Sequence, residues 1–146
     1  EVLNNVSSKM TIFCREKVSA EFLEGRITHG ELYVWHDCAF YNVFSKAPQG
    51  EGVLDTFRSD KESALKTPPG REGDLSYHGY ATKPLDELMD TLRKYEQVNT
   101  DRLHIAIGST LLGKQVRLFP NSYYKNKAVF DYSLKRFPNI RFVEKH

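Results

Sequence analysis

The sequence predicts an α/β fold built on a mostly parallel, doubly wound sheet. Short apolar runs of strand type alternate with segments that have the 3.6-residue periodicity of amphipathic helices. The strand-type runs are almost continuously apolar, as is typical of parallel strands that are covered on both faces. This alternation favours successive βαβ units over an antiparallel sheet or a helical bundle.

The first part of the chain is predicted to form one βαβ unit. Residues 10–16 and 31–40 are predicted strands, and residues 18–23 between them are a predicted helix. His36 and Asp37 interrupt the second apolar run, so burial there would oblige them to find hydrogen-bonding partners.

A stretch rich in Pro and Gly, SKAPQGEG, follows this unit and has the composition of a linker. It divides the chain into residues 1–45, the expected remnant of a first domain, a linker at residues 46–51, and a second domain at residues 52–146.

The second domain repeats the alternation of strands and helices. Predicted strands lie at residues 52–58, 97–99, 115–119 and 140–143, and predicted helices at residues 84–95, 102–112 and 126–137. Residues 59–76 are predicted to form a long polar loop with one short helix at residues 61–66.

Composition excludes several classes of protein. The 21 basic and 19 acidic residues are mixed along the chain and give a net charge of +2, so nothing resembles a nucleic-acid-binding patch. No apolar run approaches the ~20 residues that span a bilayer, and no secretory signal is evident, so we expect a soluble, cytoplasmic protein. Cys14 and Cys38 are expected to be reduced, buried thiols, and no His or Cys spacing predicts a metal site.

The segment TDRLH, residues 100–104, places three ionisable side chains at the predicted start of a helix. Asp101 is expected to cap the helix, because Asp accepts hydrogen bonds from the first unpaired amides. Arg102 offers a planar donor fork that suits a phosphate or a carboxylate. His104 is a candidate proton donor or acceptor, although a structural role for a single histidine is the simpler interpretation.

A second polar segment, NSYYKN at residues 121–126, lies at another turn from strand to helix. Its candidate binding residues are Ser122, Tyr123, Lys125 and Asn126; the alternative is a polar loop with a helix cap. Arg15 and Arg58 each lie at the carboxyl end of a predicted strand, from which an arginine can reach into a crevice. The NSYYKN turn is expected at the same edge of the same sheet as the start of the TDRLH helix, the edge where ligands bind in such folds.

These motifs resemble the C-terminal portion of the polysaccharide pyruvyl transferases. That family typically shows TDRLH, a helix ending like LLGK, and NSYGKN, and this chain has TDRLH, LLGK and NSYYKN in the same order. Three upstream segments, IFCREKVSAEFL, HDCAF and GVLDTFRSDKES, are similar to further parts of the family pattern. Two positions depart from it: Tyr124 stands where the family commonly has Gly, and His36 where it commonly has Pro.

The resemblance implies a GT-B-like arrangement of two Rossmann-type domains, with phosphoenolpyruvate as the donor and no separate cofactor. The expected reaction places pyruvate as a ketal on a sugar hydroxyl during exopolysaccharide biosynthesis. It implies that His104 is catalytic and that Arg15 and Arg102 bind the donor. Because only the last part of a first domain is expected in this chain, the chain alone is expected to be an inactive fragment or a weak donor binder.

Two alternatives remain open from the sequence. A GT-B glycosyltransferase would use the same helix start to hold the diphosphate of a nucleotide sugar. A non-catalytic carbohydrate-binding fragment would keep the fold without the reaction.

Overall fold

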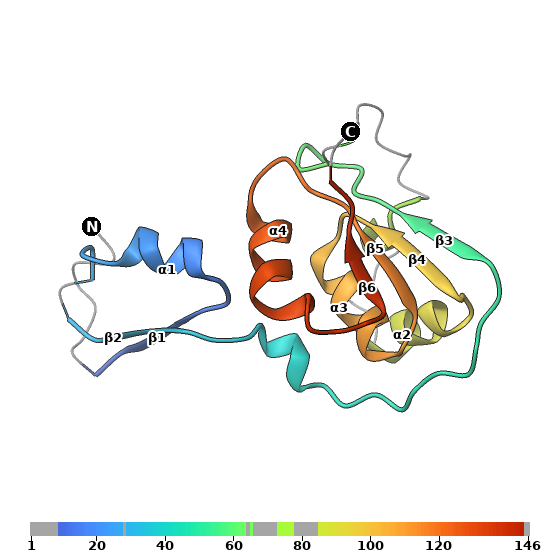
Figure 1. Ribbon diagram of the computed structural model, residues 1–146, viewed down its shortest axis with the longest axis horizontal. Helices are drawn as coiled ribbons and strands as arrows, with labels where there is room; N and C mark the ends of the chain where they lie inside the picture. Colours follow the sequence, from blue (N-terminus) through green and yellow to red (C-terminus); the bar gives the residue numbers. More distant parts are fainter. Residues whose placement is uncertain (1–8, 28, 64, 66–72, 78–84, 145–146) are drawn as a thin grey trace.

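The computed structural model describes residues 9–27, 29–63, 65, 73–77 and 85–144. It contains two parallel sheets, one of two strands and one of four. Figure 1 shows the two-stranded unit set to one side of the larger sheet, with the chain passing between them after β2. The parallel α/β fold that the sequence predicts is therefore confirmed.

The N-terminal unit consists of β1 (Thr11–Cys14), α1 (Lys17–Leu23) and β2 (Glu31–Val34). The two strands pair in parallel, as the prediction of one βαβ unit requires. Glu16 caps α1, because its carboxylate accepts a hydrogen bond of 3.0 Å from the Ser19 amide.

The predicted strand at residues 31–40 is too long. β2 ends at Val34, and Cys38–Tyr41 forms a short 3₁₀ helix, η2. The carboxylate of Asp37 accepts a 3.0 Å hydrogen bond from the Ala39 amide, which favours a turn over a strand. As a consequence Cys38 is exposed, contrary to the prediction, whereas Cys14 is buried; both thiols are free.

The larger unit holds the remaining elements. They are β3 (Val53–Thr56), a short 3₁₀ turn η4 (Leu75–Tyr77), α2 (Leu85–Arg93), β4 (Gln97–Thr100), α3 (Leu103–Leu111), β5 (Gln115–Leu118), α4 (Lys125–Val129), a π-helical turn η5 (Phe130–Leu134) and β6 (Ile140–Phe142). The strand order is β3-β4-β5-β6 and every pair is parallel. An order that runs in one direction corresponds to one half of a doubly wound sheet, in which the order reverses at a switch point.

Only part of the expected short helix at residues 61–66 can be assessed. Residues 61–63 and 65 are not helical, and the remaining two lie outside the described residues. The predicted first residue of α2, Pro84, also lies outside them.

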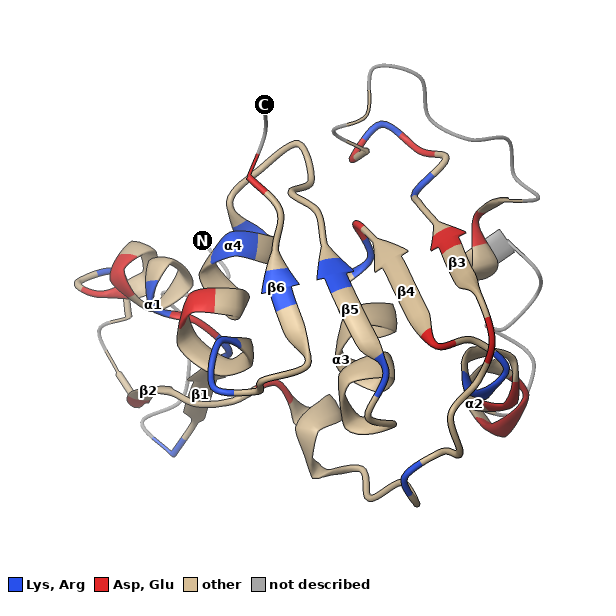
Figure 2. Ribbon diagram, turned by 45° about the vertical axis from the view of Figure 1, so that its right-hand side comes forward, with Lys and Arg blue, Asp and Glu red and all other residues tan. Residues whose placement is uncertain are grey.

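The four-stranded sheet has one buried face and one polar face. Val98 and Thr100 are fully buried, whereas Gln97 and Asn99 between them are partly exposed. On the polar face Asn99 donates a 2.6 Å hydrogen bond to Asp55. Basic residues on β5 and β6 continue this face, because they are in register with Asn99. Figure 2 shows their positions along the two strands. Coverage on both faces, which the apolar runs predicted, is therefore absent from the described part of this sheet.

The helix α3 lies in both hydrophobic clusters of the core. Leu103 and Ile107 pack in a cluster with β5 and β6, while Ile105 and Leu112 pack in a second cluster with α2 and β4. Gly113 ends the helix with a φ of +83°. Because α3 is enclosed on nearly all sides, the residues at its start have fixed positions.

The LLGK motif is structural in this fold. The side chain of Lys114 is buried and donates hydrogen bonds of 2.9 Å to the carbonyl oxygens of Pro48 and Arg93. Burial lowers the pKa of Lys114, and the nearby charge of Arg93 lowers it further. The motif therefore joins the segment around Pro48 to the end of α2.

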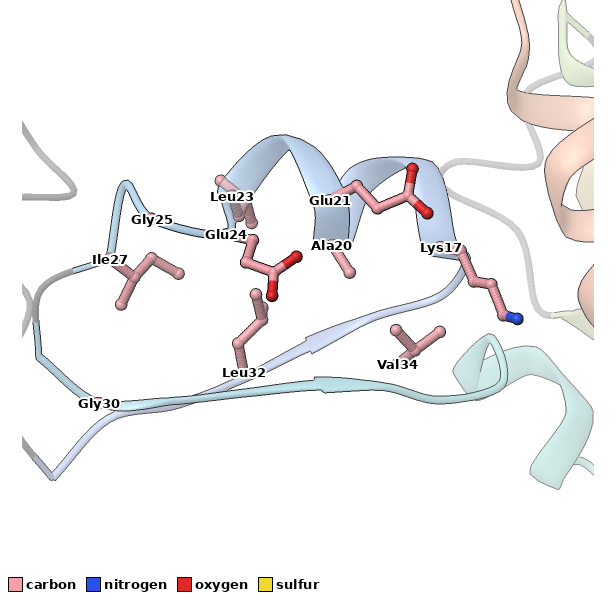
Figure 3. A pocket seen from close by; sticks show the side chains of 10 residues that line it. All are labelled: Lys17, Ala20, Glu21, Leu23, Glu24, Gly25, Ile27, Gly30, Leu32 and Val34. Atoms are coloured by element: carbon pink, nitrogen blue, oxygen red, sulfur yellow. The ribbon is translucent and has the colours of Figure 1, made fainter.

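A hollow of about 460 Å³ lies between α1 and β2 (Figure 3). Its lining combines aliphatic side chains, such as Leu23, Ile27, Leu32 and Val34, with charged ones from α1 and its C-terminal end. This hollow is a feature of the thinly covered N-terminal unit and holds none of the predicted site residues. Within the part of the chain that the structure describes, none of the helices has the length and apolar character of a transmembrane span.

Candidate functional site

A small hollow at the start of α3 gathers residues from three strand-to-helix turns. It has a volume of about 170 Å³, and its lining includes Arg58, Arg102, His104, Lys125 and Asn126. These residues follow β3, β4 and β5, whose carboxyl ends lie at one edge of the sheet because the strands are parallel. The structure therefore brings these five residues together at that edge.

Asp101 does not cap α3. The N-cap position belongs to Arg102, and no side chain caps it. Asp101 is almost fully buried, and its carboxylate accepts hydrogen bonds from the Arg58 amide at 2.7 Å and from Ser63 Oγ at 3.1 Å. Burial raises the pKa of Asp101 despite these hydrogen bonds. Its role is to join the turn after β3 to the turn after β4.

Arg102 is held by a buried carboxylate that the sequence did not single out. Its Nε donates a 2.5 Å hydrogen bond to Asp74, and its Nη2 forms a second bond to the same carboxylate. Asp74 is fully buried and also accepts a 2.9 Å hydrogen bond from the Ser59 amide. Burial alone would raise the pKa of Asp74, but Arg102 and the amides outweigh it and lower that pKa.

The pairing with Asp74 changes what Arg102 offers a ligand. The Nε–Nη2 edge of the guanidinium is occupied, so an anion in the hollow would meet the N–H groups that remain on Nη1 and Nη2. The position of Asp74, within a polar stretch between β3 and α2, carried no signal that sequence reasoning uses.

Arg58 is likewise paired with carboxylates of its own turn. It contacts Asp60 at 2.9 Å and Glu62 at 2.7 Å. Burial would lower the pKa of Arg58, but the hydrogen bond and charge of Asp60, with Glu62 and Asp101, raise it. Both arginines of the hollow are thus positioned by acidic neighbours.

The NSYYKN segment divides into lining and exposed residues. Asn126 is buried and donates hydrogen bonds to the carbonyl oxygens of Asp101 at 2.6 Å and Phe119 at 3.0 Å, so its amide group joins two turns. Lys125 donates a 2.9 Å hydrogen bond to the Tyr123 hydroxyl. Ser122 and Tyr123 are exposed and are not part of the lining of the hollow.

A second hollow, of about 430 Å³, also has His104 in its lining. Its lining includes Phe13, Arg15, Ser19, Asp37 and His104. Asp37 accepts a 2.7 Å hydrogen bond from Arg15 Nη1, and the same oxygen lies 3.3 Å from His104 Nε2. The structure therefore brings Arg15, which follows β1, to His104 at the start of α3.

Asp37 was not among the candidate binding residues. The only sequence signal was its position as a charged residue in an apolar run, which indicated that it needs partners. Burial alone would raise its pKa, but the Ala39 amide, Arg15 and His104 together lower it.

Among the described residues, no group of three or more His, Cys, Asp or Glu side chains could hold a metal ion.

Comparisons with known proteins extend this description. No protein-family model matches the sequence, and no curated protein matches it either. The chain is similar to the crystal structure of a functional uncharacterized protein from Klebsiella pneumoniae subsp. pneumoniae NTUH-K2044, with a TM-score of 0.66 and 31% sequence identity. The match covers 91% of this chain and 54% of the Klebsiella chain, so this chain spans about half the length of that protein.

The fold defines the class of this protein: the chain is a Rossmann-like parallel α/β protein.

Proposed function

We propose that this chain carries donor-binding and proton-transfer residues of a polysaccharide pyruvyl transferase. Such an enzyme moves pyruvate from phosphoenolpyruvate onto a saccharide. The observation that carries the proposal is that His104 lines two hollows. One hollow is lined by Arg58, Arg102 and Lys125, and the other by Arg15. Cations that line the same hollows as an accessible histidine suit a small anion that must also be protonated.

The size of the hollow at the start of α3 supports a small donor. Its volume of about 170 Å³ lies below the roughly 300 Å³ at which sites for drug-sized ligands begin. A phosphoenolpyruvate carries one phosphate and one carboxylate on three carbons, whereas a nucleotide sugar is several times larger. The hollow also lies at the start of α3, where unpaired amides favour anions.

The proposed reaction places one proton on carbon and removes two from the acceptor. The methylene carbon of phosphoenolpyruvate takes a proton and becomes the methyl group, so the adjacent carbon accepts a saccharide oxygen. The bond from that carbon to the phosphate oxygen then breaks, and a second saccharide oxygen closes the ketal. Two hydroxyl protons are released, one balancing the methyl group and one leaving with phosphate. His104 would supply or relay the first proton.

Ligand-dependent melting tests the choice of donor. We expect phosphoenolpyruvate to raise the melting temperature of the chain, because a ligand that binds only the folded state stabilises it. UDP, GDP and CMP sugars should leave it unchanged. Stabilisation by a nucleotide sugar but never by phosphoenolpyruvate would favour the glycosyltransferase alternative and overturn the proposal.

Arg102→Lys should weaken phosphoenolpyruvate binding and also lower the stability of the fold. Sequence reasoning predicts an intact fold, but a lysine cannot reproduce the bidentate pair with buried Asp74. Titration calorimetry measures the first effect and urea unfolding the second. Arg141→Lys, at an exposed position on β6, is the matched control and should change neither. Unchanged donor affinity in Arg102→Lys would contradict the binding role.

His104→Ala should lower the turnover number more than the donor affinity if His104 transfers the proton. Its side chain is 65% exposed, so the fold should tolerate the change. The effect is measured by steady-state kinetics of phosphate release with a saccharide acceptor. The assay uses a catalytically active form of the protein. Full activity in this variant would remove His104 from the mechanism.

A further inference from the structure

We propose that Asp37 is a positioning residue that holds the ring of His104 and the guanidinium of Arg15 through one shared carboxylate oxygen. The consequence is that His104 presents Nδ1, rather than Nε2, to the reacting molecule. The catalytic part of this inference rests on the proposed function, whereas the ring orientation can be tested without it.

Asp37 is itself fixed in place. It is buried, and one oxygen accepts a 3.0 Å hydrogen bond from the Ala39 amide at the start of η2. Residues Ala39 and Phe40 of η2 pack against the hydrophobic cluster that contains the start of α3. The other oxygen faces Arg15 at 2.7 Å and His104 at 3.3 Å. A carboxylate that is anchored on one side can orient groups on the other.

The chemistry of the contact determines the protonation of the ring. The lowered pKa of Asp37 keeps the group ionised at neutral pH, and an ionised carboxylate only accepts hydrogen bonds. His104 Nε2 must therefore carry a proton in this contact. In the neutral ring the lone pair then lies on Nδ1, for which the described residues provide no hydrogen-bond partner.

The neighbouring histidine provides an internal contrast. Arg136 lies 3.2 Å from His36 Nε2, and a guanidinium only donates, so that nitrogen accepts. His36 therefore carries its proton on Nδ1, which donates to Ser133 Oγ at 2.9 Å. His104 and His36 are thus held in opposite tautomers, His104 by a carboxylate and His36 by a guanidinium.

Asp37→Asn tests the positioning directly. The amide oxygen of Asn can still accept the bond from Ala39, while its amino group would face His104 and donate to Nε2. Histidine ¹⁵N resonances, recorded on the chain at a pH where the rings are neutral, should show the His104 proton move from Nε2 toward Nδ1. His36 should not change. The matched control is Asp131→Asn, whose exposed carboxylate pairs with Lys127, and it should leave both rings unchanged.

Asp37→Ala is a second variant, and its effect does not depend on how the side-chain amide of an asparagine is oriented. Removal of the carboxylate should release the His104 ring, so its side-chain order parameter should fall while that of His36 stays constant. An unchanged His104 signal in both variants would overturn the inference. Equal changes in His104 and His36 would also overturn it, because they would indicate general disruption of the junction.

Kinetics connects the positioning to the proposed reaction. Asp37→Asn should lower the turnover number through His104 and raise the KM for phosphoenolpyruvate through Arg15. In a His104→Gln background the effect of Asp37→Asn on the turnover number should largely vanish, and the effect on KM should remain. An undiminished effect on the turnover number in that background would contradict action through His104. If the wild-type chain binds no phosphoenolpyruvate but the ring shift occurs, the proposed function fails and the positioning role stands.

Discussion

The two sheets of this protein bury very different amounts of apolar surface. The four-stranded sheet and its helices contain both hydrophobic clusters of the described residues. Of the apolar residues described in the N-terminal unit, only Cys14 and Ala20 are buried, while Phe13, Phe22 and Tyr33 are exposed. Because apolar burial is the main stabilising contribution in folding, the N-terminal unit depends on its junction with the larger unit.

The junction is formed mainly by polar and aromatic contacts. His36 contacts Ser133, and the Tyr132 hydroxyl donates a 3.2 Å hydrogen bond to the carbonyl oxygen of Val34. The rings of Phe40 and Phe137 stack with their centroids 6.0 Å apart. Asp37, which follows β2, contacts His104 at the start of α3. Part of the candidate site therefore lies beside the unit that buries less apolar surface. Segments with few buried contacts open at lower free energy than the core.

The largest expected difference between the two units concerns their buried carboxylates. Asp74→Ala should lower the free energy of unfolding by about 3–5 kcal/mol, because it leaves the largely buried guanidinium of Arg102 with only a 3.7 Å contact to Asp60. Asp37→Ala should have a smaller effect, since the Arg15 side chain is 33% exposed and water can replace the lost partner. Urea unfolding of the two variants measures the difference. Equal losses would contradict the comparison.

Truncation of apolar side chains should give the next largest difference. Leu118→Ala should cost about 2–5 kcal/mol, because the side chain is fully buried in the larger unit. Phe13→Ala should stay within about 0.5 kcal/mol, because that ring is 64% exposed. Chemical denaturation of both variants is the measurement. A large loss in Phe13→Ala would indicate that the N-terminal unit has a core of its own.

The smallest expected effect is a pH dependence of the junction. Burial, together with the charge of Arg136, lowers the pKa of His36 below its usual value. The folded state therefore favours the neutral ring, and this contribution is present above the unfolded pKa of about 6.5. It is lost as the pH falls through the lower folded value. Hydrogen exchange of β2 amides should accelerate as the pH is lowered below about 6.5, after correction for the intrinsic rate.

His36→Gln should flatten this dependence, because glutamine does not titrate. The matched control is His29→Gln, at an exposed position before β2, which should leave the dependence intact. A dependence that persists in His36→Gln would assign it to another group at the junction.

Periodicity and turn chemistry were sufficient to predict the order of the elements. The alternation predicted β1, α1 and all four strands of the larger sheet, because apolar spacing reflects which residues face the core. The placement of Arg58, Arg102 and Lys125 at one edge followed from the parallel order alone. The length of β2 could not be predicted, since the hydrogen bond from the Ala39 amide to Asp37 competes with the strand.

The sequence by itself determined the alternating elements and the edge where charged residues meet. Only the tertiary structure decided which charges pair. Asp74 reaches Arg102 from a polar stretch 28 positions away, and Asp37 reaches His104 across 67 positions. The physical reason is that the spacing of apolar residues along the sequence indicates only which side of a helix or strand faces the core. An ion pair between distant turns depends instead on the path of the intervening chain, which packing of the whole fold sets.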